Sequence, residues 1–185
     1  KALILAYPNN PTGGIMTREQ LLAIIPVIEK HDLLVISDEI YAELTYVGRH
    51  VSIASLGNMR GRTVVIGGFS KAFAMTGWRV GFVCAPAEID EAMFKIHQYG
   101  IMCAPRVSQH AANAALSEGF ADGFSVVEEM RAEYARRGRF MVNAFNSMGL
   151  ECFQPRGAFY VFPSVAKTGL DEERFANRLL REKKV

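Results

Sequence analysis

The residues from Gly67 to Gly81 read GGFSKAFAMTGWRVG and join two apolar runs, Thr63–Ile66 and residues 80–84. A lysine between two buried strands is costly to place unless it is paired or used, which singles out Lys71. Glycines on both sides let the backbone approach another group closely. Arg79 carries planar donors that suit a phosphate or a carboxylate. This segment therefore indicates a ligand site in a turn between two strands.

Two more motifs follow apolar runs in the same way. Residues 7–14 read YPNNPTGG and come after the apolar residues 2–6. Residues 37–41 read SDEIY and come after the apolar residues 33–36. In open α/β sheets, ligands gather at the carboxyl ends of the strands. The polar residues of both motifs are therefore expected at the same edge of the sheet as Lys71.

Together, YPNNPTGG, SDEIY, the Ser-Lys pair and the following arginine resemble the pyridoxal-phosphate (PLP) site of the class I/II aminotransferases. This is the aspartate-aminotransferase-like group of fold type I, and the resemblance covers essentially the whole chain. It implies PLP as cofactor and a homodimer in which two subunits build each site. The group also contains C–S lyases and a cyclising synthase, so the motifs identify a cofactor more firmly than a reaction.

The resemblance assigns a role to five residues. Lys71 would hold the PLP aldehyde as an imine and later move a proton, the work of a lysine in such enzymes. Asp38 would keep the pyridine nitrogen protonated, so that the ring acts as an electron sink. Tyr41 and Asn10 would donate to the phenolic oxygen, and Arg79 would bind the phosphate. Only Lys71 is given a catalytic role; all five are expected to bind the cofactor.

Each of these residues also has a plain structural interpretation. Lys71 suits a surface position, and Asp38 suits a turn or a helix N-cap. Tyr41 suits a core, Arg79 suits an ion pair, and Asn10 is a frequent turn residue before proline. What favours the functional interpretation is the order of the motifs.

Other parts of the site are uncertain from sequence. Many relatives carry a serine at the position of Gly68, where its hydroxyl touches the phosphate, and Ser70 replaces it only in part. Glu39 is expected to face away from Asp38. Residues 157–160 read GAFY and resemble a family segment near the substrate mouth, although a plain strand explains them equally well. The resemblance places the glycine-rich phosphate turn, the ring-stacking aromatic and the carboxylate-binding arginine outside this chain.

Composition excludes several classes of function. The 185 residues are 50% hydrophobic and 22% charged with a net charge of +2, too small for a nucleic-acid or membrane-surface partner. No apolar run reaches transmembrane length. The four histidines show no metal-ligand spacing, so no metal is expected. The widely spaced Cys84, Cys103 and Cys152 predict buried thiols in a reducing compartment. With no transmembrane run and no signal peptide at the start of these residues, a cytoplasmic location is expected by default.

Apolar runs and turn residues predict an α/β fold, part of a doubly wound and mostly parallel sheet. Strands are expected at 2–6, 33–37, 63–67 and 79–85. A capping box of Thr17 and Gln20 begins a helix that reaches about His31 and that Pro26 should kink or split. Further helices are expected at 87–99, 106–117, 124–148 and 172–184, with Gly119 ending the second. Trp78, Met75, Met93, Met102 and Met130 are interpreted as packing residues.

Two later segments, 150–153 and 158–162, are expected to form strands. Residues 1–140 would be the C-terminal part of a PLP-binding large domain, and 141–185 would begin a small α+β domain. Because family members are about twice this length, the chain is expected to be an internal piece of a larger enzyme.

The most specific function that these observations predict is an aminotransferase. It would move an amino group between an L-amino acid of the aspartate or aromatic type and a 2-oxo acid. Two alternatives stay open: a PLP-dependent β-elimination (C–S) lyase, and the ligand-sensing aminotransferase-like domain of a DNA-binding regulator. A winged-helix segment upstream would favour the second, and these residues contain none. The chain alone is expected to be inactive.

Overall fold

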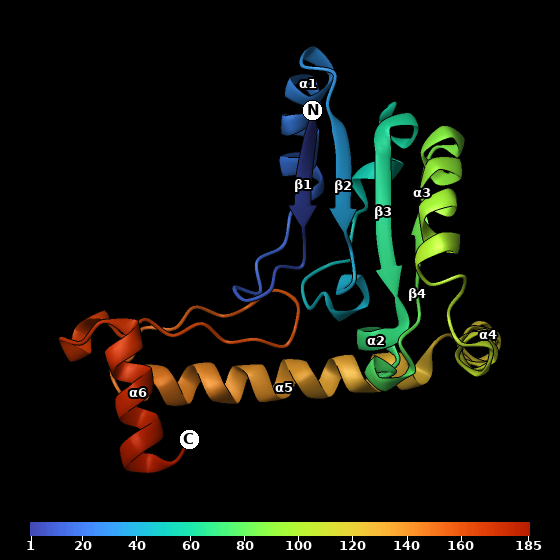
Figure 1. Cartoon of the computed structure of the whole chain (residues 1–185). Helices are drawn as coiled ribbons and strands as arrows, with labels where there is room; N and C mark the ends of the chain where they lie inside the picture. Colours follow the sequence, from blue (N-terminus) through green and yellow to red (C-terminus); the bar gives the residue numbers. More distant parts are fainter.

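The computed structural model describes all of Lys1–Val185 and is built around one four-stranded sheet. Its strands are β1 (Ala2–Ala6), β2 (Leu34–Asp38), β3 (Thr63–Gly68) and β4 (Gly81–Cys84), in that order across the sheet. The first three strands are parallel, and β4 is antiparallel to β3 (Figure 1). The predicted α/β class with a mostly parallel sheet is therefore confirmed.

The register of the strands aligns their carboxyl ends. Ala6 of β1 lies opposite Asp38 of β2, and Asp38 lies opposite Ile66 of β3. The chain therefore leaves all three strands at one edge of the sheet, where the motifs around Asn10, Tyr41 and Lys71 begin.

Helix α1 (Arg18–Lys30) covers one face of the sheet. Its predicted capping box is present: the Thr17 side chain accepts from the Gln20 backbone N–H, and the Gln20 side chain accepts from the Thr17 backbone N–H. Of the kink or split expected at Pro26, the split is wrong, because the helix continues through Pro26 as one element. Leu21, Ile25 and Ile28 are buried at helical spacing, and they pack into a core with Tyr7, Val35, Ile53, Leu56 and Met59.

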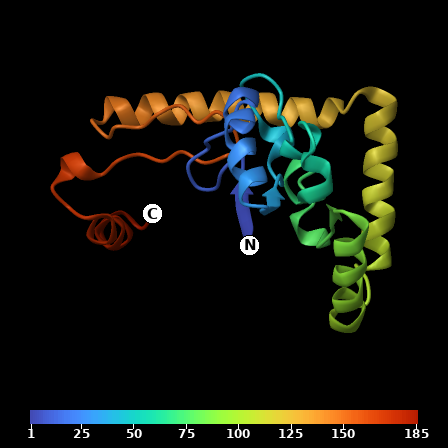
Figure 2. The ribbon, with the colours of Figure 1, turned by 90° about the horizontal axis from the view of Figure 1, so that it is seen from above.

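The remaining helices lie after β3. They are α2 (Phe69–Ala72), α3 (Ala87–Gly100), α4 (Arg106–Asp122), α5 (Ser125–Ser147) and α6 (Glu172–Lys183). Short 3₁₀ turns occur at Ala42–Leu44, Ile53–Ser55, Met59–Arg62, Thr76–Trp78 and Ala166–Thr168. Helix α5 runs beneath the carboxyl ends of the parallel strands β1, β2 and β3, and α4 turns away from it (Figures 1 and 2). None of these helices has both the length and the apolar character that a membrane crossing demands.

Several predicted boundaries are wrong. Helix α4 continues past Gly119 to Asp122 and ends at Gly123, which has φ 73°. A side chain at Gly119 would meet the Phe124 ring at 2.4 Å, so this glycine permits packing rather than ending the helix. β4 begins at Gly81 rather than at Arg79, because Arg79 has left-handed backbone angles that a strand excludes.

The two strands expected after α5 do not form. Residues 150–162 contain no strand, only an isolated bridge between Thr45 and Gly157. Their backbone donors bond to loops instead: Arg156 N–H donates to the Gly13 carbonyl, and Ala158 N–H donates to the Leu44 carbonyl. These hydrogen bonds satisfy backbone N–H groups of the segment without a partner strand.

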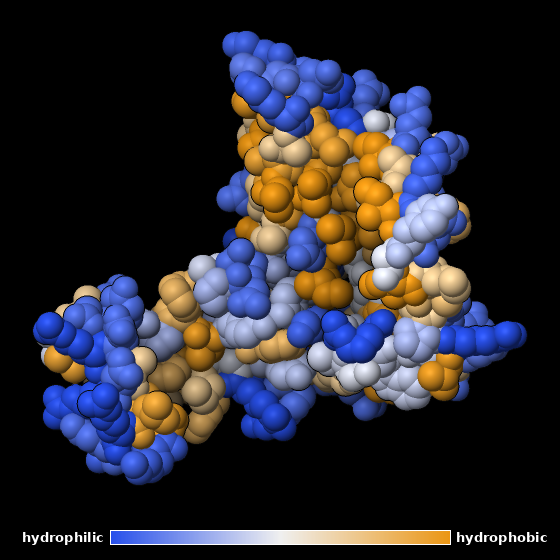
Figure 3. Space-filling model, in the orientation of Figure 1, coloured by the Kyte–Doolittle hydropathy of each residue, from blue (hydrophilic) through white to orange (hydrophobic).

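The second face of the sheet is open. Figure 3 shows a broad apolar surface over the strands. By the strand register Ile4 and Val83 belong to this face, and they are 71% and 43% exposed. The whole chain has 12340 Å² of accessible surface, against roughly 8,900 Å² typical of a monomer of this mass.

Cys84 and Cys103 are exposed, so the expected burial is right only for Cys152.

Of the tryptophan and methionines predicted to pack in the core, some are buried and others are exposed. Met75 is buried, and Met93 and Met130 are half-buried. Met102 is 74% exposed and Trp78 is also exposed, so neither serves as the expected core residue. Both lie in segments that follow β3, where little of the chain covers them.

Candidate cofactor site

Lys71 lies in the single helical turn α2, directly after β3. The turn is anchored by Phe69 and Ala72, which are both buried, and this leaves the lysine half-buried. The Lys71 Nζ atom lies 5.7 Å from the centre of the Tyr41 ring and 5.6 Å from that of Phe159. The amine is thus flanked by two aromatic rings from distant parts of the sequence.

A hydroxyl cluster lies beside this amine. The Tyr41 and Tyr160 hydroxyl oxygens are 2.6 Å apart, and Asn10 Nδ2 donates to the Tyr160 hydroxyl at 3.1 Å. Burial, and then the neighbouring Tyr160 hydroxyl, raise the pKa of the Tyr41 phenol. Tyr41 is therefore protonated at neutral pH and able to donate. The structure brings together Asn10, Tyr41 and Lys71, three of the five residues singled out from sequence.

Two glycines explain how residues 155–160 reach this cluster. Gly13 has φ +69°, and a side chain there would lie 2.4 Å from the Pro155 side chain. A side chain at Gly157 would lie 2.6 Å from Pro8. Because both positions lack a Cβ, the loop after β1 and the 155–160 segment interlock, and the Gly157 N–H donates to the Gly13 carbonyl.

Helix α5 supports the cluster from below. Tyr41, Leu44 and Ala158 form a small core against which Met130 and Tyr134 of α5 pack. The Phe159 ring packs edge-on against Tyr41, with centroids 5.4 Å apart. The rings beside Lys71 are therefore held by three separate elements.

The hydroxyl contact between Tyr41 and Tyr160 gives a stability prediction. Tyr160→Phe in the cofactor-free protein should lower the free energy of unfolding by about 0.5–1.5 kcal/mol, because the part-buried Tyr41 hydroxyl loses its partner. Urea unfolding measures this. Tyr99→Phe, at a tyrosine that is 88% exposed, is the matched control and should change little. In a Tyr41→Phe background the Tyr160→Phe effect should shrink; an unchanged effect there would contradict the contact.

Asp38 and Glu39 point in different directions at the end of β2. Asp38 is half-buried, and its Oδ1 accepts from the Ile40 backbone N–H at 3.2 Å. Glu39 is buried and bonds to Ser37, His50 and Ser52 on the other side of the strand. The expectation that Glu39 faces away from Asp38 is confirmed. The Asp38 contact is a turn contact, so its proposed role rests on its place at the strand end.

The phosphate side is the least organised part of the site. Arg79 is exposed, and its Nη1 donates to the backbone carbonyl of Thr76, three residues earlier, at 2.8 Å. No contact joins it to the hydroxyl cluster. A side chain at Gly68 would lie 3.0 Å from Ile40 Cδ1 and 3.2 Å from Gly81 Cα, so the serine of many relatives would be crowded here. The Ser70 carbonyl accepts from the Thr76 hydroxyl, which orders this loop.

The donor set fits most of PLP. A half-buried amine, two neighbouring donors at Asn10 and Tyr41, and a carboxylate at a strand end match an aldehyde, a phenolic oxygen and a pyridine nitrogen. Phe159 and Tyr160 complete this group although the sequence left them undecided. The only sequence feature that pointed to them was the GAFY segment. Its role becomes clear only from the contact between Tyr160 and Asn10, 150 positions away.

Comparisons with known proteins point to the same chemistry. All of residues 1–185 match the family model described as aminotransferase class I and II. The chain is 50% identical over its full length to a putative aminotransferase of Bacillus subtilis, and 46% identical to an aspartate aminotransferase of Pyrococcus abyssi. An aromatic aminotransferase of Pyrococcus horikoshii has the same fold, with a TM-score of 0.95 and 46% identity over 100% of this chain. The chain spans about half the length of these relatives: 47% of each curated protein and 49% of that structure.

Proposed function

The chain belongs to the class I and II aminotransferase family, and from this we propose that the whole protein is a PLP-dependent aminotransferase. Its substrates would be an L-amino acid of the aspartate or aromatic kind and a 2-oxo acid. The names of the P. abyssi and P. horikoshii relatives support this choice. The observation that carries the proposal is the placement of the Lys71 amine beside the Asn10–Tyr41–Tyr160 cluster.

The residues divide the work of such a reaction. PLP, when bound, supplies an electron sink for the bonds at the substrate Cα. Lys71 would hold the cofactor and move a proton at the substrate Cα, because its amine is the basic group at this cluster. Asp38 would keep the pyridine nitrogen protonated. Asn10 and Tyr41 would donate to the phenolic oxygen, and Arg79, whose guanidinium now donates to the Thr76 carbonyl, would bind the phosphate.

Three further parts of the proposal concern the whole protein. We propose a homodimer, as the resemblance to the aminotransferase family implies. Its three cysteines are free thiols, which fits a reducing cytoplasm. Residues 1–140 would be part of the PLP-binding domain and 141–185 the start of the smaller one, although α5 crosses this boundary without a break.

A direct assay tests the type of reaction. The whole protein with PLP, aspartate or an aromatic amino acid, and 2-oxoglutarate should form glutamate. Elimination is the competing use of the same residues, and a β-substituted amino acid tests for it. Release of ammonia and pyruvate from that substrate, with no glutamate formed in the first assay, would contradict transamination and favour the lyase.

A further inference from the structure

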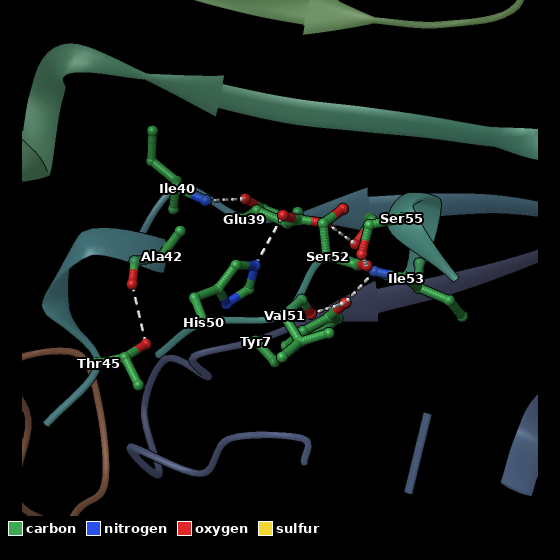
Figure 4. A network of polar contacts seen from close by, with 12 residues as sticks. Tyr7, Glu39, Ile40, Ala42, Thr45, His50, Val51, Ser52, Ile53 and Ser55 are labelled. Carbon is green, nitrogen blue, oxygen red and sulfur yellow. Dashed lines mark hydrogen bonds and ion pairs between the residues drawn. The ribbon is translucent and has the colours of Figure 1, made fainter. Parts of the chain in front are cut away.

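Glu39 is a buried carboxylate that the proposed reaction does not use. Only 8% of the residue is exposed. Its Oε1 accepts from the Ser37 hydroxyl at 2.8 Å and from the Ser52 hydroxyl at 2.7 Å, and its Oε2 lies 2.7 Å from His50 Nε2 (Figure 4). Both carboxylate oxygens are therefore bonded. A buried charge is tolerated only where it is paired in this way.

Glu39 is ionised at neutral pH. Burial acts to raise the pKa of its carboxyl, but hydrogen bonds from His50, Ser52 and Ser37 outweigh burial and hold that pKa below its usual value. The bonds at this carboxylate are thus charge-assisted, which makes them stronger and more directional than neutral ones.

The same network reaches the loop that carries Asn10. The His50 ring stacks on Tyr7, with centroids 5.1 Å apart and the rings inclined by 28°. Figure 4 shows Tyr7 beside the 50–53 segment, where its hydroxyl donates to the Val51 carbonyl at 3.2 Å and accepts from the Ile53 N–H at 3.0 Å. The Tyr7 N–H donates to the Asp38 carbonyl. Tyr7 opens the motif in which Asn10 lies.

Glu39 also touches the third strand of the site. Its backbone N–H donates to the Ile66 carbonyl of β3 at 2.9 Å, shortly before α2 and Lys71. Successive residues of an extended strand end point to opposite faces. The side chain of Glu39 is therefore fixed on one face, while its neighbour Asp38 is presented on the other.

We propose that Glu39, held by His50, is a positioning residue for the cofactor site. It fixes the turn 38–41, which presents Asp38 and Tyr41, against the loop of Asn10 and the end of β3. That turn cannot rotate without breaking the charge-assisted bonds at Glu39. This inference rests on the proposed function, because it concerns the orientation of residues toward PLP.

The test compares Glu39→Gln with Glu43→Gln in the whole protein. Glu43 is exposed four positions along, so its variant removes the same charge without touching the network. Glu39→Gln should weaken PLP affinity roughly tenfold, in line with other residues that orient ligand-binding groups. It should also raise the pH midpoint of the visible absorbance of the Lys71-bound cofactor, because donors at the phenolic oxygen lose their alignment. Glu43→Gln should change neither.

A purely structural role would give a different result. Glu39→Gln would then lower the melting temperature of the cofactor-free protein but leave the pH midpoint and the PLP affinity unchanged, which would overturn the inference. If Glu39→Gln does not fold, His50→Gln decides by the same midpoint, since it disturbs one of the three bonds. Borohydride trapping in Lys71→Ala tests the proposed function separately. Loss of trapping there, with an unchanged midpoint in Glu39→Gln, would defeat this inference alone.

Discussion

Lys71→Ala in the whole protein will abolish borohydride-trappable PLP and lower transaminase turnover by at least about 10³-fold. A positioned general acid–base alone contributes roughly 10²–10⁴-fold, and the loss of covalent attachment adds to this. No other lysine lies between the rings of Tyr41 and Phe159. A neighbouring amine is therefore not placed to take over its work.

Two control variants make this experiment specific. Lys95→Ala removes an exposed lysine of α3 and should leave trapping and turnover unchanged. Lys71→Arg keeps a cation between the two rings but loses the nucleophile, since guanidinium is always protonated. It should fold like the original protein and fail to trap PLP. Trapped cofactor on Lys71→Ala, located by peptide mapping, would mean that another residue is the attachment site.

Local signals explain what the sequence predicted well. The Thr17–Gln20 capping box needs only four consecutive residues, and it starts α1 where expected. The β-branched run before Gly67 needs only its own apolar character to indicate a buried strand. Because these strands are parallel, their ends meet at one edge, and the motifs that follow them come together as a consequence.

Contacts over long separations explain what was missed. The hydrogen bond between Asn10 and Tyr160 joins residues 150 positions apart, and no local sequence pattern near either residue predicts it. The apolar GAFY segment suggests a strand, but its backbone bonds to the Leu44 and Gly13 loops instead. Gly119 looks like a helix end, whereas its missing side chain makes room for Phe124. Propensity was overridden by packing in each case.

Arg79 illustrates a limit of a different kind. Its guanidinium donates to the Thr76 carbonyl in its own loop, although the family resemblance predicts that it binds the phosphate. Arginine side chains are long and adopt many rotamers, so sequence order fixes the loop but not the direction of the side chain. Its role therefore remains part of the proposal.

The 185 residues produced alone will associate and show no transaminase turnover above background. Ile4 and Val83 are 71% and 43% exposed on the open face of the sheet. Exposed apolar patches and unpaired strand edges of this kind promote association. Light scattering should show particles that grow with protein concentration. The control Val83→Ser should reduce this growth, because it replaces an exposed apolar side chain on the open face of the edge strand β4.

Turnover should fail for a separate reason, which lies in the phosphate contacts. Within these residues Arg79 alone is proposed for the phosphate, and the resemblance places further contacts outside them. Each charge-assisted contact that is missing costs about 1.5–3 kcal/mol, or roughly a tenfold to hundredfold loss of PLP affinity. Lys71 should still react weakly with free PLP, as accessible amines do, so borohydride trapping should rise linearly with PLP and not saturate. Saturable trapping together with glutamate formation at the rate of the whole protein would show that this chain carries a complete site.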